Sequence, residues 1–334
     1  MKISIALATF NGARYLENQL NSYLTQTRPP DELVVSDDNS WDQTWDILEE
    51  FKSRSPFPVR ILRNDGPRGI FWNFRSAVLQ CQGEIIVLSD QDDIWFSTKL
   101  ATIENYFSEH PQLLALATNS VQIDGDGSPR HVDTWQDVCR FSERRLRRWG
   151  DNPVRIFLAF RGICAAHGLA VSRELATMCG EPSNLQHYAV VFRAFDSLLF
   201  ATAAVLRRSH WLYQPLTAYR RHGTNTSTFE KQSNVEIAKL DAGDRYLNRV
   251  RQVELAMQHL DEKGIEIDSS YRRRITEMLA HYKRATVVRN GGLRGIGMLL
   301  YLICSGSYAR NAKPSRNLIG DVLCCISNTV NRLK

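Results

Sequence analysis

Short apolar runs alternate with helical patterns along the first 118 residues. Four of these runs have the pattern of buried strands: residues 3–8, 33–35, 59–62 and 85–88. Between them, apolar residues recur at helical spacing over 15–24 and 45–51. Strands and helices that alternate in this way predict an α/β fold with a mostly parallel sheet, flanked by helices and joined by right-handed crossovers.

The pattern changes after residue 118. A turn-rich loop lies at 124–127, and a basic cluster at 144–149 fits either an anionic acceptor or a solvated helix face. Further on, charged amphipathic helices are predicted over 235–260 and 271–288. We therefore expect one globular domain over 1–229 and a helical region over 230–334.

The basic charge of the chain belongs to its C-terminal third. Residues 1–229 carry 24 basic and 25 acidic side chains, whereas residues 230–334 carry 18 and 11. In that third, an apolar stretch at 297–304 is flanked by Arg289, Arg294, Arg310, Lys313 and Arg316. Such a helix can lie in a membrane interface, or it can pack against the main domain or a second copy in a homodimer. No nucleic-acid-binding module is recognisable, so we expect no nucleic-acid partner.

The composition limits the class of protein and the cellular compartment. The 334 residues are 43% hydrophobic and 23% charged, which excludes a disordered chain. The seven cysteines are scattered without a C-x-x-C pair, so we expect a reducing cytoplasm and neither a disulfide framework nor a zinc site. No stretch approaches the roughly 20 apolar residues of a spanning helix. The apolar N-terminus reads as a first strand rather than a signal peptide.

Three polar loops directly follow predicted strands, at 9–12, 36–40 and 89–93. The carboxyl ends of parallel strands meet at one edge of a sheet, where α/β proteins bind ligands, so we expect these loops to lie together. Asp90 and Asp92 can place two oxygens on one hard divalent ion, whose other ligands are commonly phosphate oxygens. Each loop alone also fits a turn or a helix cap, but three at matching positions favour a nucleotide and metal site.

These motifs resemble the family 2 inverting glycosyltransferases in order and spacing. They are Thr9-Phe10-Asn11-Gly12, Asp37-Asp38, and Asp90-Gln91-Asp92-Asp93-Ile94-Trp95 followed by Lys99. The third motif is most similar to bacterial rhamnosyltransferase-type enzymes of surface-polysaccharide assembly. The resemblance covers residues 1–229 and implies a GT-A fold, with a nucleotide-sugar-binding half over 1–118 and an acceptor half over 119–229. It also implies a divalent metal ion, Mg²⁺ or Mn²⁺.

By motif position, the resemblance implies three groups of site residues. The nucleotide sugar would meet Thr9, Phe10, Asn11, Asp37, Asp38, Asn64, Gly69, Asn73, Asp90, Gln91 and Arg220. The metal would be held by Asp90, Asp92 and His222. The sugar or acceptor side would include Trp95, His167 and Gly168. A structural role remains open for both histidines.

Asp196 is a single acid among aromatic and aliphatic residues. Burial without an offsetting partner would raise its pKa toward that of a useful base. The segment resembles the catalytic-base motif of the family, in which an Asp at the start of a helix takes the proton of the acceptor hydroxyl. The alternative is an N-cap for a helix over 197–204, and the two roles are compatible.

Together these features predict transfer of rhamnose or a similar hexose from a dTDP- or UDP-sugar to a glycan or lipid-linked acceptor. The expected setting is O-antigen or other lipopolysaccharide assembly, in the cytoplasm or peripherally on the cytoplasmic face of the inner membrane. The alternative is a non-catalytic scaffold that binds sugar nucleotides or glycans, against which the presence of Asp90, Asp92 and Asp196 argues. The first loop lacks G-x-G-x-x-G, which disfavours an oxidoreductase, and lacks the glycine-rich basic loop of a nucleotidyltransferase.

Overall fold

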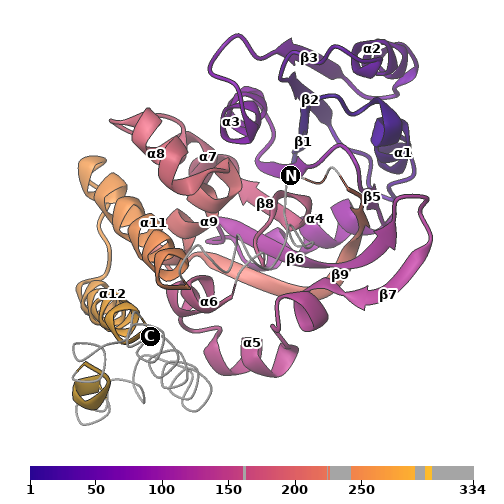
Figure 1. The fold of residues 1–334 in the computed structure, drawn as a ribbon. Coiled ribbons are helices and arrows are strands. Elements are labelled where there is room, and N and C mark those ends of the chain that lie inside the picture. The colour runs from indigo at the N-terminus through magenta and orange to yellow at the C-terminus, as the bar shows by residue number, and fades with distance from the viewer. Residues whose placement is uncertain (161–162, 224, 226–241, 290–297, 303–334) are drawn as a thin grey trace, which may run out of the picture. The chain divides into compact units, whose positions relative to one another are not determined.

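The computed structural model describes residues 1–160, 163–223, 225, 242–289 and 298–302 (Figure 1). The chain divides into two compact units, Met1–Thr224 and Asn225–Lys334. All the residues that the sequence motifs single out as site residues lie in the first unit.

Nine strands in the described part of the first unit form one sheet, in the order β3-β2-β1-β4-β8-β6-β9-β5, with β7 paired to β6 (Figure 1). They are β1 (Ile3–Thr9), β2 (Glu32–Asp37), β3 (Val59–Arg63), β4 (Ile85–Ser89), β5 (Ile94–Trp95), β6 (Ala115–Asp124), β7 (Pro129–Asp133), β8 (Leu169–Ser172) and β9 (Ser209–Arg221). The half formed by β3, β2, β1 and β4 is wholly parallel, and β6 is parallel to β9. β8 runs antiparallel to both of its neighbours, β4 and β6. The prediction of a mostly parallel sheet is confirmed.

Helices cover both faces of this sheet (Figure 1). One face carries α1 (Ala13–Leu24), α2 (Thr44–Arg54) and α4 (Lys99–Glu109). The other carries α3 (Ile70–Gln80), α7 (Arg173–Cys179), α8 (Leu185–Phe192) and α9 (Phe195–Val205), which contact one another. Two short helices, α5 (Glu143–Trp149) and α6 (Pro153–Ala159), a π-helical turn (Thr134–Val138) and a 3-10 turn (Ala166–Gly168) complete the described part of the unit.

One hydrophobic core lies between the sheet and the helices α1, α2 and α4. Leu16 and Leu20 of α1 and Leu48 of α2 are fully buried against Ile5 and other apolar strand residues. Burial of each such side chain stabilises the fold by roughly 1.5–3 kcal/mol. The apolar strand runs seen in the sequence thus anchor the sheet, and the polar loops at its carboxyl edge are left free to form a site.

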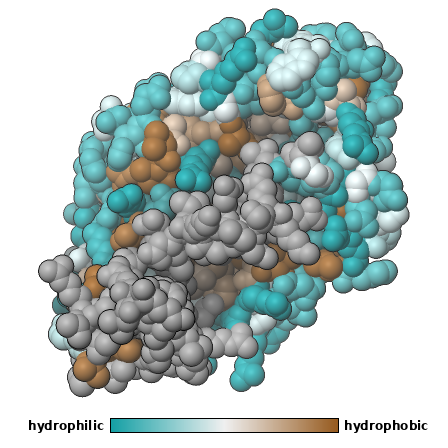
Figure 2. All heavy atoms as spheres, viewed as in Figure 1, coloured by the Kyte–Doolittle hydropathy of each residue, from teal (hydrophilic) through white to brown (hydrophobic). Residues whose placement is uncertain are grey.

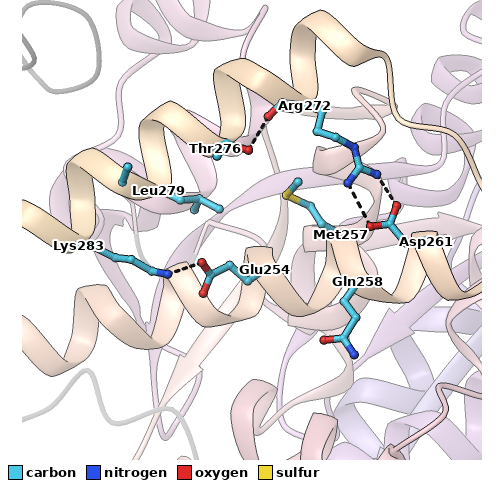
Figure 3. A pocket seen from close by; sticks show the side chains of 9 residues that line it. Glu254, Met257, Gln258, Asp261, Arg272, Thr276, Leu279 and Lys283 are labelled. Atoms are coloured by element: carbon cyan, nitrogen blue, oxygen red, sulfur yellow. Dashed lines mark hydrogen bonds and ion pairs between the residues drawn. The ribbon is translucent and has the colours of Figure 1, made fainter.

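The second unit contains the helix pair α11 (Ala242–Glu262) and α12 (Ser269–Arg289). Figure 3 shows the cleft between them, about 370 Å³ in volume, with Met257 and Leu279 in its lining. Ion pairs join Lys283 to Glu254 and Arg272 to Asp261 across the two helices. Because these charges are exposed, each pair contributes little to stability. α12 confirms the helix predicted over 271–288, and residues 235–241 of the other predicted helix lie outside the described residues.

Hydrophobic residues gather on the viewed surface over α8, where Val190 is 74% exposed (Figure 2). Among the described helices, none is by itself long and apolar enough to cross a membrane; α8 and α9 reach that length and composition only as a pair, across a bend of 95°. Of the apolar stretch predicted at 297–304, only 298–302 belong to the described residues, where they are helical. The flanking cations Arg294, Arg310, Lys313 and Arg316 lie outside them.

Candidate active site

The polar loops after β1 and β2 meet at the carboxyl edge of the sheet, as their positions predict. Thr9 and Asp37 are register partners on the adjacent strands, and the Thr9 hydroxyl donates to the Asp37 carboxylate at 2.7 Å. Asp37 is fully buried and also accepts from the Ser40 backbone N–H at 2.8 Å and the Trp45 indole N–H at 2.9 Å. Its oxygens therefore hold the loop that follows β2.

Asn11 supports the same loop from the side of β1. Its backbone N–H donates to the Ser40 hydroxyl at 2.8 Å, and its side-chain oxygen accepts from the Trp41 backbone N–H at 3.0 Å. Asn11 adopts a positive φ of 47°, which asparagine tolerates better than most residues. The exposed ring of Phe10 meets that of Trp41 edge to face, with centroids 5.2 Å apart.

Asp38 binds two further residues of the predicted nucleotide group. Its two oxygens accept from the Asn64 side-chain amide and from the Gly69 backbone N–H, both at 2.8 Å. Gly69 has a φ of +115°, which only glycine adopts readily, and it immediately precedes α3. On α3, Asn73 donates to the Thr9 carbonyl at 2.9 Å, while its own side-chain oxygen is buried without a partner among the described residues. The structure thus brings Thr9, Asp38, Asn64, Gly69 and Asn73 together.

The acidic loop after β4 is tied to the end of β9. The buried Asp93 carboxylate accepts from the Arg220 backbone N–H at 2.9 Å. The Arg220 guanidinium donates to the Asp92 carbonyl at 2.8 Å and lies 4.9 Å from the centre of the Tyr15 ring. Arg220 is only 1% exposed, so the structure places this predicted donor contact beneath the acidic loop.

His222 and Asp92 meet although they are 130 residues apart. The His222 Nε2 atom lies 2.8 Å from the Asp92 carboxylate, and the two side chains are 10% and 15% exposed. The His222 ring packs on Tyr15, with centroids 4.6 Å apart. These two predicted metal ligands are therefore neighbours.

A second acid and histidine group lies beside them. Ligand atoms of Asp90, Asp93 and His167 all lie within 4.8 Å of one another. Burial, with the charges of Asp92 and Asp196 nearby, raises the pKa of Asp90 to about 8. One oxygen of Asp93 is buried without a partner among the described residues. Carboxylates crowded in this way, one with an orphaned oxygen, fit a divalent cation.

Lys99 is a site residue whose function the sequence did not reveal. Its ammonium is fully buried, donates to the His167 carbonyl at 2.7 Å and the Thr217 hydroxyl at 2.8 Å, and lies 4.0 Å from the centre of the Trp95 ring. Burial lowers the pKa of Lys99 to about 7, against the opposing effect of Asp93 and Asp90. The feature of the sequence that could have identified Lys99 is its position four residues after Trp95. Trp95, predicted on the sugar side, is 2% exposed and belongs to the core.

His167 and Gly168 lie next to Asp90. The His167 ring stacks on Tyr219 at 4.5 Å and lies 3.2 Å from the Ser120 hydroxyl. Burial lowers the pKa of His167 to about 3, so its ring is neutral, and its backbone N–H donates to Asp90. A Cβ at Gly168 would lie 2.4 Å from the Thr118 carbonyl oxygen, so no side chain fits there.

Asp196 lies in the first turn of α9, close enough to Asp90 for its charge to raise the pKa of that residue. The helix begins at Phe195 with Ala194 as its N-cap, so the alternative of Asp196 as the cap is wrong. Burial raises the pKa of Asp196 to about 6, although the backbone N–H groups of Ser197 and Ala166 stabilise the charged form. Near neutral pH this carboxylate is ionised and can accept a proton.

Comparisons with known proteins agree with this geometry. Residues 4–163 match the sequence profile of glycosyl transferase family 2. An uncharacterized glycosyltransferase of Nostoc sp. is 33% identical over 264 residues, 74% of this chain and 75% of that protein. Poly(ribitol-phosphate) β-N-acetylglucosaminyltransferase TarS of Staphylococcus aureus is 34% identical over 162 residues, 47% of this chain and 27% of TarS. dTDP-rhamnosyl transferase RfbG of Shigella flexneri is 35% identical over 98 residues, 28% of this chain and 34% of RfbG.

Solved structures show the same fold at low identity. The structure of S. aureus TarS 1–349 in complex with UDP-GlcNAc superposes with a TM-score of 0.58 at 16% identity, covering 98% of this chain and 93% of that one. A mannosyltransferase from Pyrobaculum calidifontis in complex with GDP-Man and Mn²⁺ gives a TM-score of 0.50 at 15% identity, covering 100% and 88%. The sheet and its flanking helices therefore form a GT-A fold. The extended match to the Nostoc relative, with the family profile, shows that this chain is a glycosyltransferase of family 2.

Proposed function

We propose that the protein transfers a hexose from a nucleoside-diphosphate sugar to an acceptor hydroxyl, with inversion at the anomeric carbon. The observation that carries this proposal is the position of Asp196. It is a buried carboxylate with a pKa raised to about 6, and it lies near the acidic loop at the edge where the nucleotide-side residues converge. An acid with this pKa matches the requirement for a general base near neutral pH.

In the proposed reaction, Asp196 takes the proton of the acceptor hydroxyl as that oxygen attacks the anomeric carbon. The bond from this carbon to the diphosphate oxygen breaks, and its electron pair leaves with the nucleoside diphosphate. A single displacement of this kind inverts the configuration, so no covalent enzyme intermediate is required. Thr9, Asn11 and Asp38 would hold the nucleoside within the half formed by residues 1–118.

Asp90, with Asp92 and His222 or with Asp93 and His167, would hold a divalent cation, Mg²⁺ or Mn²⁺. Such an ion neutralises charge on a departing diphosphate when bound. Lys99 balances part of the negative charge of the acidic loop from below.

Our proposal for the class of nucleotide-sugar donor is based on the named activities of two relatives. RfbG is named as a dTDP-rhamnosyl transferase, and a further relative, Escherichia coli WfaP, is named as a UDP-Glc:α-D-GlcNAc-diphosphoundecaprenol β-1,3-glucosyltransferase. The aligned segments cover only 34% and 38% of these proteins. We accordingly propose a dTDP- or UDP-sugar as donor, with rhamnose tested first. The proposed acceptor is a glycan or lipid-linked oligosaccharide of surface-polysaccharide assembly at the cytoplasmic side of the membrane.

A thermal-shift screen of the whole chain against UDP, dTDP, GDP and their sugars, with and without Mn²⁺ or Mg²⁺, tests the donor site. A ligand that binds only the folded state raises its apparent stability. We expect a metal-dependent shift with UDP or dTDP that is lost in Asp92→Ala. No shift with any nucleotide at millimolar concentration would contradict the proposal and favour a non-catalytic scaffold.

A further inference from the structure

The side chain of Gln91 joins two of the loops that form the site. Its Oε1 atom accepts from the Phe10 backbone N–H at 2.8 Å, and its Nε2 atom donates to the Phe10 carbonyl at 3.0 Å. Gln91 lies between Asp90 and Asp92 in the acidic loop, whereas Phe10 lies between Thr9 and Asn11 in the loop after β1. One primary amide thus spans both polar groups of one residue on the opposite loop, an arrangement we call the Gln91–Phe10 clasp.

Gly12 provides the space that the clasp needs. A Cβ at residue 12 would lie 2.3 Å from Gln91 Oε1 and 2.6 Å from Gln91 Cδ, closer than non-bonded atoms approach. The φ of Gly12 is −97°, which any L-residue adopts without strain. Glycine is therefore required at this position for room beside Gln91 and not for its backbone conformation.

The clasp connects residues proposed to bind the nucleotide with residues proposed to bind the metal. Phe10 is flanked by Thr9, whose hydroxyl and carbonyl are bonded to Asp37 and Asn73, and by Asn11, which holds the loop after β2. Gln91 is flanked by Asp90 and Asp92, two of the three acids that we propose as metal ligands. Fixing one loop therefore restricts the other. Because both polar ends of Gln91 bond to Phe10, this side chain can act on the first loop through the Phe10 backbone, a role distinct from the direct donor contact that the sequence motif implies.

We propose that Gln91 is a positioning residue that couples nucleotide binding at the first loop to metal binding at the acidic loop. This inference rests on the proposed function of the same site. Coupling between two ligands is reciprocal: if the metal tightens the nucleotide, the nucleotide tightens the metal by the same factor. Both hydrogen bonds of the clasp are exposed, so we expect its removal to lower the coupling about tenfold, a factor that corresponds to about 1.4 kcal/mol.

The test compares four versions of the full chain: wild type, Gln91→Ala, Gly12→Ala and the double variant. Calorimetric titration gives the affinity for UDP, and separately for dTDP, with and without Mn²⁺; the ratio of the two affinities measures the coupling. We expect this ratio to fall about tenfold in each single variant. The double variant should match Gln91→Ala, because the methyl group that Gly12→Ala adds fits once the glutamine side chain is gone.

Thermal unfolding of the same four proteins without ligand gives a double-mutant cycle for stability. Gly12→Ala should lower the melting temperature when Gln91 is present and leave it unchanged in the Gln91→Ala background. A merely structural role would lower stability in Gly12→Ala and leave the Mn²⁺ ratio at its wild-type value. An unchanged ratio in Gln91→Ala, or additive effects of the two substitutions, would overturn the inference. Failure of wild type to bind either nucleotide with metal would instead overturn the proposed function, and the coupling with it.

Discussion

Asp37 and Asp38 show how adjacent carboxylates acquire different duties from their partners. Asp37 is fully buried and accepts from Thr9, Ser40 and Trp45. Asp38 accepts from two groups between β3 and α3, the Asn64 side chain and the Gly69 backbone. The order of residues could not distinguish the two, because both acids lie at the end of the same strand.

We expect Asp37→Ala to lower the free energy of unfolding by about 2–4 kcal/mol, since it leaves several buried donors without an acceptor. Denaturant unfolding of the isolated protein measures this loss. Asp38→Ala is the matched control: it should cost less stability and reduce nucleotide affinity more. Equal effects of the two substitutions on stability and on nucleotide binding would contradict the division of roles.

The raised pKa of Asp196 predicts the pH dependence of activity. The base acts only when it is ionised, so its raised pKa moves the onset of activity from the ordinary range of an aspartate up to about pH 6. We expect kcat/KM for the donor to rise with pH through about 6 and to level off above it. A profile that is flat between pH 5 and 7.5, or that falls with rising pH, would exclude Asp196 as the titrating base.

At the scale of elements, apolar runs made β1, β2 and β4 predictable, but three features were not. α3 was not predicted because it opens with three adjacent apolar residues, Ile70, Phe71 and Trp72, which do not show helical spacing. β6 was not predicted because Thr118, Asn119 and Ser120 interrupt its apolar run, although all three are buried. The start of α9 was placed two residues late because its cap, Ala194, carries no capping side chain.

The junction of α8 and α9 positions Asp196 through a strained backbone. Arg193 ends α8 with a φ of 61° and donates its N–H to the Ala189 carbonyl at 3.0 Å, while its side chain is exposed. Glycine adopts such a φ without penalty, whereas alanine does not. We expect Arg193→Gly to be more stable than Arg193→Ala by about 1 kcal/mol, as measured by chemical denaturation. If the two variants unfold at the same denaturant concentration, the backbone at residue 193 is not strained.

At the scale of the whole molecule, the site depends on contacts that no local pattern could reveal. Asp92 meets His222 across 130 positions, and Lys99 meets Thr217 across 118. Both contacts arise because β9 returns to the acidic loop through its pairing with β5 and β6. The motifs predicted a set of candidate site residues. They could not predict that Arg220 and Trp95 are buried beneath it, since burial is decided by the packing of distant strands.

Whether Asp196 is the catalytic base is tested most directly by comparing wild type with Asp196→Asn. The measurement is the release of nucleoside diphosphate from the nucleotide sugar that the binding screen identifies. Asparagine has nearly the shape of aspartate and keeps an oxygen for the Ser197 N–H, but it cannot take a proton. We predict that Asp196→Asn binds the donor as wild type does, in the presence of Mn²⁺, and turns it over at least roughly 100-fold more slowly. Turnover by Asp196→Asn at the wild-type rate would show that Asp196 is not the base.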